Sequence, residues 1–149
     1  MALHPTPELV AKAWILGVSG VPSGKVATSL PEDRDTWPAG FVVATLLGGT
    51  PQLHVKKRES VIDVTCWYPS KDGSNKPQWN KAAQLAEIVF DAGYDDVLTV
   101  QRLLSALPAA YNDARVLSFM SGEPEKRGND EAGNAAFGFE AEMHWIEVA

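Results

Sequence analysis

The stretch from Trp37 to Gly93 constrains the fold of this chain more than any other part of the sequence. It opens with an almost unbroken apolar run over residues 41–47, which ends at two glycines. In residues 61–68 apolar and polar side chains alternate, as they do in a strand with one buried face. Residues 79–90 carry apolar side chains at helical spacing. The stretch therefore predicts two strands covered by a helix.

The flanking sequence adds further elements on both sides. Thr6 and Pro7 suit the cap and the first turn of a helix over residues 7–16. The remaining expected elements are a short strand near 25–30, a helix over 97–107, and strands over 115–120 and 137–145. This order predicts an α+β fold: a single domain with a mainly antiparallel sheet of four to five strands and helices packed on one face.

The alternation of the strands divides their side chains between two faces. The face expected to form the core under the helix over 79–90 comprises Val42, Ala44, Leu46, Ile62, Val64, Cys66, Phe139, Ala141 and Met143. The opposite face carries Asp63, Glu140 and Glu142. Phe41 and Trp67 have the parity of this opposite face. Large apolar groups there suit a subunit interface, although the chain's own loops would cover them equally well.

Residues 122–135 have the composition of a loop. The segment is rich in glycine and charged residues and contains few apolar ones. Such a segment cannot bury enough apolar surface to order itself, so we expect it to be mobile at its tip. No linker elsewhere divides the chain into two domains.

The composition excludes several classes of protein. With 149 residues and a formal net charge of −6, the chain is about one domain long and lacks the clustered cations of a nucleic-acid binder. Cys66 is its only cysteine, so no intrachain disulfide forms. Neither a signal peptide nor an apolar stretch of membrane-spanning length is recognised. We therefore expect a soluble protein that is made in a reducing cytoplasm and has no membrane partner.

No group of residues has the sequence spacing of a catalytic, cofactor or metal site. His4, His54 and His144 lie far apart and lack the spacing of a zinc finger or a zinc-binding helix. Cys66 has the parity of the core face, which predicts a buried and inert thiol. The sequence therefore predicts no catalytic residues, no cofactor and no metal.

Several short motifs, which together cover most of the chain, carry a family resemblance. A helix at the N-terminus precedes the phrase Val26-Ala27-Thr28-Ser29-Leu30-Pro31 and a strand that ends in Gly48-Gly49. After these come Ile62-Asp63-Val64-Thr65-Cys66-Trp67, the helix Ala82-Ala83-Gln84-Leu85-Ala86 and a last strand of alternating aromatic residues. In these features the chain resembles the tail terminator proteins of long-tailed bacteriophages, above all those of phages that infect actinobacteria.

The resemblance implies a structural virion protein that works by assembly and not by catalysis. It implies a ring of six subunits at the head-proximal end of the phage tail. Such a ring caps the tail tube protein and docks to a head-completion or neck protein, while DNA passes through its channel without specific binding. The sheet would face inward and toward neighbouring subunits, so that Asp63, Glu140 and Glu142 line the channel or the subunit seams. The protein would be made in the host cytoplasm and end in the virion.

Three alternatives stay open at this point. Residues 123–131 and 94–107 depart from the family pattern, and they leave room for another neck or head–tail connector component. A small α+β enzyme would use Glu140, Glu142 or His144 for acid–base chemistry. An adaptor would bind a partner peptide by strand addition along an exposed sheet edge.

Overall fold

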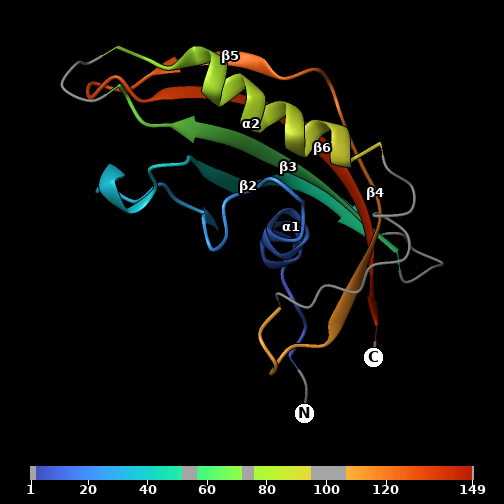
Figure 1. Ribbon diagram of the computed structural model, residues 1–149. Coiled ribbons are helices and arrows are strands. Elements are labelled where there is room, and N and C mark those ends of the chain that lie inside the picture. Colours follow the sequence, from blue (N-terminus) through green and yellow to red (C-terminus); the bar gives the residue numbers. More distant parts are fainter. Residues whose placement is uncertain (1–2, 52–56, 72–75, 95–106, 149) are drawn as a thin grey trace.

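The described part of the chain folds into one curved sheet with two α-helices on the same face (Figure 1). The computed structural model describes residues 3–51, 57–71, 76–94 and 107–148. Its elements, in chain order, are α1 (Pro7–Leu16), β1 (Val26–Ala27), the short helix η1 (Arg34–Thr36), β2 (Phe41–Pro51), β3 (Lys57–Tyr68), α2 (Trp79–Ala92), β4 (Asp113–Ser121), β5 (Glu125–Asn129) and β6 (Ala135–Val148). The predicted α+β class is confirmed.

The sheet has six strands in the described part of the chain. Its order is β1-β2-β3-β6-β4, and β5 pairs with the first part of β6. Only the two-residue β1 is parallel to its neighbour, and all the other pairs are antiparallel. The strand number exceeds the expected four to five because a strand forms within residues 122–135, where the sequence predicts a loop.

The two longest strands, β3 and β6, form the centre of the sheet. They pair antiparallel without interruption from Lys57, which lies opposite Ile146, to Tyr68, which lies opposite Ala135. Val64 faces Phe139 across this pair, and both side chains are buried. Because successive side chains of a strand point to opposite faces, this register sends the apolar residues of both strands to the helix-covered side.

The helices cover that side with different residues. α2 packs small side chains on the sheet, since Ala82, Ala86 and Val89 are each fully buried. α1 contributes Trp14, whose indole stacks on Phe119 of β4 with ring centroids 4.3 Å apart. Burying such large rings removes about 150–250 Å² each from water, so this stack anchors the N-terminal helix to the far edge of the sheet.

α1 begins and ends where the sequence predicts. The Thr6 hydroxyl accepts a hydrogen bond from the backbone N–H of Leu9 at 3.3 Å, and Pro7 occupies the first turn. The helix ends before Gly17, whose N–H bonds the carbonyl oxygen of Trp14. A cap of this kind satisfies a backbone donor that has no partner within the helix.

One predicted core residue is wrong. Leu46 is 39% exposed, whereas the eight others expected beside it are buried. It lies opposite Ile62 on the core face, just before a register shift at Gly48. β1 pairs only with Val42 and Val43, so no strand of the described chain flanks Leu46 on the other side of β2. The alternation of side chains identified the face on which Leu46 lies. It did not show the point along β2 beyond which that face is exposed to solvent.

The loop predicted over residues 122–135 is also wrong, because β5 occupies its middle. β5 contains no large apolar side chain, and two cations hold it instead. The Lys126 ammonium lies 3.8 Å from the centre of the Trp79 ring on the helix side. Arg127, on the opposite side, donates to Asp63 at 2.6 Å and to Thr65 at 2.9 Å. Contacts of this kind stabilise a strand whose composition predicts disorder.

A tight turn joins β5 to β6. The Asp130 carboxylate accepts hydrogen bonds from the backbone N–H and the side-chain amide of Asn134, at 2.9 and 2.8 Å. Gly133 adopts a positive φ of 80° within this turn. The expected mobility at the tip of residues 122–135 stays a prediction.

Two other expectations have simple outcomes. The strand near 25–30 is confirmed only over two residues, as β1. The helix over 97–107 lies outside the described residues apart from its last position. None of the helices in the described ranges is long and apolar enough to cross a membrane.

Replacing Ile62 with Ala is expected to lower the free energy of unfolding by about 2–5 kcal/mol, because Ile62 is fully buried and its truncation leaves a cavity. The matched control is Leu47→Ala, at a side chain that is 55% exposed. That change should stay within about 0.5 kcal/mol of the unchanged protein. Urea unfolding midpoints measure both values. Equal losses in the two variants would show that this face is not the core.

Replacing Arg127 with Ala is expected to loosen β5 without unfolding the sheet. The Asp63 carboxylate would lose its charged partner, which costs about 1–2 kcal/mol locally and speeds amide exchange in β5 about 5- to 30-fold. Hydrogen exchange resolved by residue measures this, with the centre of β3 as an internal reference. Lys76→Ala, at an exposed position, is the control. Unchanged exchange in β5 would show that Arg127 does not anchor it.

Candidate functional site

The sheet face opposite the helices carries the polar side chains of β3 and β6. Asp63 and Thr65 of β3 lie there, as do Glu140, Glu142 and His144 of β6. We call this side the open face. It holds two ionic clusters that join residues far apart in the sequence.

The first cluster centres on Arg127. Its guanidinium reaches from β5 across the sheet to Asp63 and Thr65 of β3. Gly138 of β6 leaves room for this crossing, since a Cβ there would lie 3.0 Å from two guanidinium atoms and 2.3 Å from the Val64 carbonyl oxygen. The charge of Asp63 is therefore matched by an adjacent cation.

The second cluster comprises Glu59, Glu142 and His144. Nε2 of His144 lies 2.9 Å from a carboxylate oxygen of Glu142, and Nδ1 lies 3.6 Å from one of Glu59. Glu59 and His144 face each other directly across the β3–β6 pair. The side chains of His144 and Glu59 are half-buried, whereas that of Glu142 is 58% exposed. The three residues offer ligand atoms that all lie within 4.8 Å of one another.

Asp63, Glu140 and Glu142, the residues expected on a channel or subunit seam, thus lie on one face. Glu140 stands directly opposite Asp63 and is exposed to solvent. The structure places the three on the same face. Asp63 forms an ion pair with Arg127, and Glu142 contacts the imidazole of His144. Their position in a channel or a seam remains a proposal.

The two aromatic residues expected at a subunit interface differ in burial. Phe41 is only 4% exposed, because Trp37 from the preceding loop packs on it edge to face at 6.4 Å. Trp67, which pairs with Phe41 across β2 and β3, is partly exposed. The chain's own loop therefore covers Phe41, whereas Trp67 stays partly exposed, and a subunit interface at Trp67 remains a proposal.

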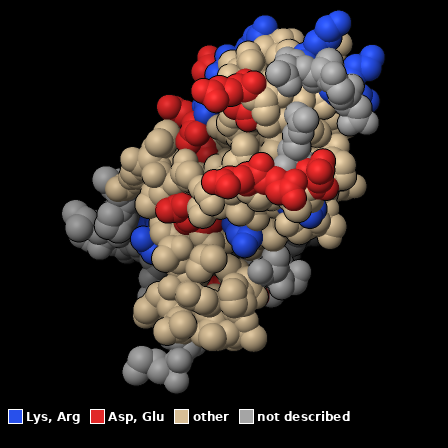
Figure 2. Space-filling model, turned by 90° about the vertical axis from the view of Figure 1, so that its left-hand side faces the viewer, with Lys and Arg blue, Asp and Glu red and all other residues tan. Residues whose placement is uncertain are grey.

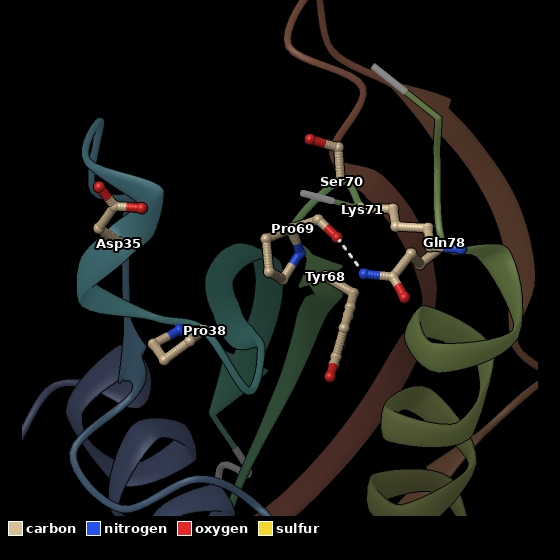
Figure 3. A pocket seen from close by; sticks show the side chains of 7 residues that line it. All are labelled: Asp35, Pro38, Tyr68, Pro69, Ser70, Lys71 and Gln78. Carbon is tan, nitrogen blue, oxygen red and sulfur yellow. Dashed lines mark hydrogen bonds between the residues drawn. The ribbon is translucent and has the colours of Figure 1, made fainter. Parts of the chain in front are cut away.

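A pocket of about 460 Å³ opens between η1 and the segment that follows β3 (Figure 3). Figure 3 shows Asp35 on one side, Lys71 and Gln78 on the other, and Pro38 and Pro69 between them. The Gln78 side-chain amide donates a hydrogen bond to the carbonyl oxygen of Pro69 at 2.9 Å, so this N–H is already bonded within the chain. The polar groups do not converge on one point, so the pocket lacks the geometry of a reaction centre.

The same end of the molecule carries a group of exposed carboxylates. η1 lies at the left of Figure 1, and Figure 2 shows the face on that side. Carboxylates form a band across the middle of this face and a second group above it, while lysine and arginine side chains lie at the upper rim and beside the middle band (Figure 2). Glu32, Asp33 and Asp35, in and beside η1, are all exposed. A surface of this charge repels nucleic acid phosphates.

Cys66 is confirmed as a buried thiol. Its side chain is fully buried on the helix-covered side of β3, and this burial raises the pKa of the thiol to about 12, against a smaller lowering by the charge of Arg127. A nucleophilic cysteine requires the opposite, an exposed thiol with a depressed pKa.

A third ionic group ties the start of the chain to its end. The Glu147 carboxylate lies 2.7 Å from Nδ1 of His4 and accepts a hydrogen bond from the Asn112 amide at 3.0 Å. Partial burial acts to raise the pKa of Glu147, but the hydrogen bonds from Asn112 and His4 and nearby positive charge outweigh it and lower that pKa. The group is structural, since it holds the segment before α1 against β4 and β6.

The sequence did not identify two residues of the open face. Glu59 precedes the alternating stretch from which the β3 strand was recognised, yet its parity with Asp63 would have placed it there. Arg127 gave no usable signal, because it lies in a polar segment and its partners are more than 60 residues away.

No known protein family matches this chain, and no curated protein does. Among solved structures, a chain from the virion of a native gene transfer agent particle has a similar fold. The superposition covers 95% of this chain and 96% of that chain, with a TM-score of 0.53 and 11% sequence identity. A likeness of this kind shows a shared fold over nearly the full length of both chains.

Cys66 is expected to stay unreactive toward a thiol reagent in the folded protein between pH 7 and pH 9. Its pKa of about 12 leaves almost no thiolate in that range, and burial blocks access. The control is a cysteine placed at the exposed Thr28, whose reaction should accelerate over the same range as a thiol with a pKa of about 8.5 ionises. Mass spectrometry of the labelled peptides separates the two sites. Labelling of both at similar rates would show that the β2–β3 core opens readily.

Proposed function

We propose that this chain is a structural component of a phage-like virion. The observation that carries the proposal is the shared fold with a chain from a gene transfer agent virion over 95% of this chain. The open face supports it, because Glu140 and Glu142 are exposed and line a hollow that is open to solvent, not a pocket from which water is excluded. General acid–base catalysis depends on such exclusion to tune its carboxyl groups.

Within that class, we propose the role of a tail terminator. The sequence motifs that resemble this family fall on the elements of the sheet and of the helix that covers it. The phrase at Val26 contains β1, and the paired glycines end the long apolar run of β2. The alanine-rich motif contributes Ala82, Leu85 and Ala86 to the buried side of α2. The alternating aromatic residues form β6. The resemblance therefore concerns the framework of the fold and not one local motif.

A terminator ring requires each subunit to present two different surfaces to its neighbours, because a closed ring is built from repeated head-to-tail contacts. The edge of β4 is one such surface. Within the described residues β4 pairs with β6 on one side only, and Met120 near its end is 44% exposed. Trp67, on the open face at the other end of the sheet, offers a second apolar surface.

In this ring the open face would line the channel or the seams between subunits. Glu140 and Glu142 would repeat around the ring, while Asp63 is already matched by Arg127. Like charge prevents DNA from adhering as it passes, because no counterions are released on contact. The proposed partners are further copies of the chain, the tail tube protein and a head-completion or neck protein, at the head-proximal end of the tail.

The test is the assembly state of the purified chain, alone and mixed with tail tubes. Native mass spectrometry should give a complex of six 16.1-kDa chains, and electron microscopy should show a ring alone or at one end of the tubes. A chain that stays monomeric in both conditions would contradict the terminator role. A ring that binds head-side proteins but not tubes would place the chain at a neighbouring position of the neck.

A pair of variants tests the proposed edge. Met120→Lys introduces a charge on the open edge of β4. We expect it to fold normally, since Glu142 lies opposite in β6, but to weaken assembly at least tenfold, because a charged and hydrated side chain replaces an apolar one at the contact. Gln84→Lys, on the exposed side of α2, is the control and should assemble like the unchanged chain. Equal assembly of both variants would move the subunit contact away from β4.

A further inference from the structure

The geometry points to a divalent transition-metal site on the open face, formed by Glu59, Glu142 and His144. Zinc is the ion that we propose. The three side chains come from two neighbouring strands at the centre of the sheet, and their ligand atoms lie within 4.8 Å of one another. The inference does not depend on the ring, because all three ligands belong to one chain.

The contacts of His144 carry the inference. An ionised carboxylate only accepts hydrogen bonds, so in the neutral imidazole the proton lies on Nε2, 2.9 Å from Glu142. This leaves the lone pair of Nδ1 directed toward Glu59, whose oxygen lies 3.6 Å away, too far for a good hydrogen bond. Two ligands about 2.1 Å from a tetrahedral zinc ion are about 3.4 Å apart. The gap between Nδ1 and Glu59 therefore has the width that a bound ion would fill.

Glu142 completes the set in one of two ways. Its contact with Nε2 fixes the ring orientation, as carboxylates do for metal-bound histidines. Its side chain is 58% exposed, so it can also turn onto the ion without disturbing the core. The remaining coordination positions face solvent and would hold water.

The ligand types select the ion. An imidazole with two carboxylates suits zinc and its neighbours in the transition series, whereas calcium and magnesium prefer oxygen ligands alone. The backbone positions of the site are fixed, because Glu59 and His144 lie opposite each other in the uninterrupted β3–β6 register. A site on paired strands needs little reorganisation to bind its ion.

The test is calorimetric titration of the full chain with zinc chloride at pH 7.5, after removal of metals with a chelator. We expect one saturable site per chain. His144→Gln and Glu59→Gln should each weaken zinc binding at least tenfold, and magnesium should bind at least tenfold more weakly than zinc.

The matched control is His4→Gln, which removes a second histidine–glutamate contact elsewhere on the surface. It should bind zinc like the unchanged chain, and circular dichroism should show every variant folded. Absence of saturable binding by the unchanged chain, or equal affinities of the His144→Gln and His4→Gln variants, would overturn the site. Because titration uses the isolated chain, its failure would leave the assembly experiments above unaffected.

Discussion

The antiparallel pairing of β3 with β6 is the constraint on which the rest of this structure depends. The two strands stay in register from Lys57 to Tyr68 without a bulge. Because side chains alternate between faces, a slip of one residue would turn every buried side chain toward solvent. The continuous register therefore fixes both the surface on which α1 and α2 pack and the composition of the open face.

The length of β6 explains the most unexpected element of the fold. β6 spans 14 residues, and β4 pairs only with its second half, from Ala141 onward. The first half would leave backbone donors and acceptors without partners, which is costly in a folded interior. β5 pairs with this half, from Ala135 to Gly138. The polar side chains of β5 are compatible with this position because the Lys126 ammonium lies over the Trp79 ring and the Arg127 guanidinium pairs with the Asp63 carboxylate.

The sequence predicted the parts of the fold that alternation and capping encode. The bounds of α1, the existence of β2 and β3 and the buried side of β6 could all be derived from local patterns, because each reflects the burial of one face or one helix end. The alternating stretch did not show that β3 begins at Lys57. β5 could not, since its stability depends on partners distant in the chain. The prediction that Leu46 is buried was wrong for a related reason. Its exposure depends on the length of β1, which the sequence around Leu46 does not indicate.

The candidate site shows the same division between local pattern and distant contact. Strand parity placed Asp63, Glu140 and Glu142 on one face. It did not identify the ionic partners Arg127 and His144, because these contacts depend on how the strands pair and not on sequence spacing. The cluster around His144 needs Glu59, which is 85 residues away in the chain. Only the β3–β6 register brings the two together.

The acids of the open face and the docking of β5 depend on each other. Asp63 and Glu140 stand directly opposite across β3 and β6, and like charges in that position destabilise a sheet. Arg127 offsets this repulsion by pairing with Asp63. Its side chain reaches that carboxylate over Gly138, which lies on the same face of β6 two residues before Glu140. The acidic pair thus attracts the cation that holds β5, and β5 in turn allows two acids to face each other on a surface that stays negative beyond them. A face built in this way keeps exposed carboxylates at Glu140 and Glu142 while its own strands remain paired, and the channel surface proposed above would need both properties.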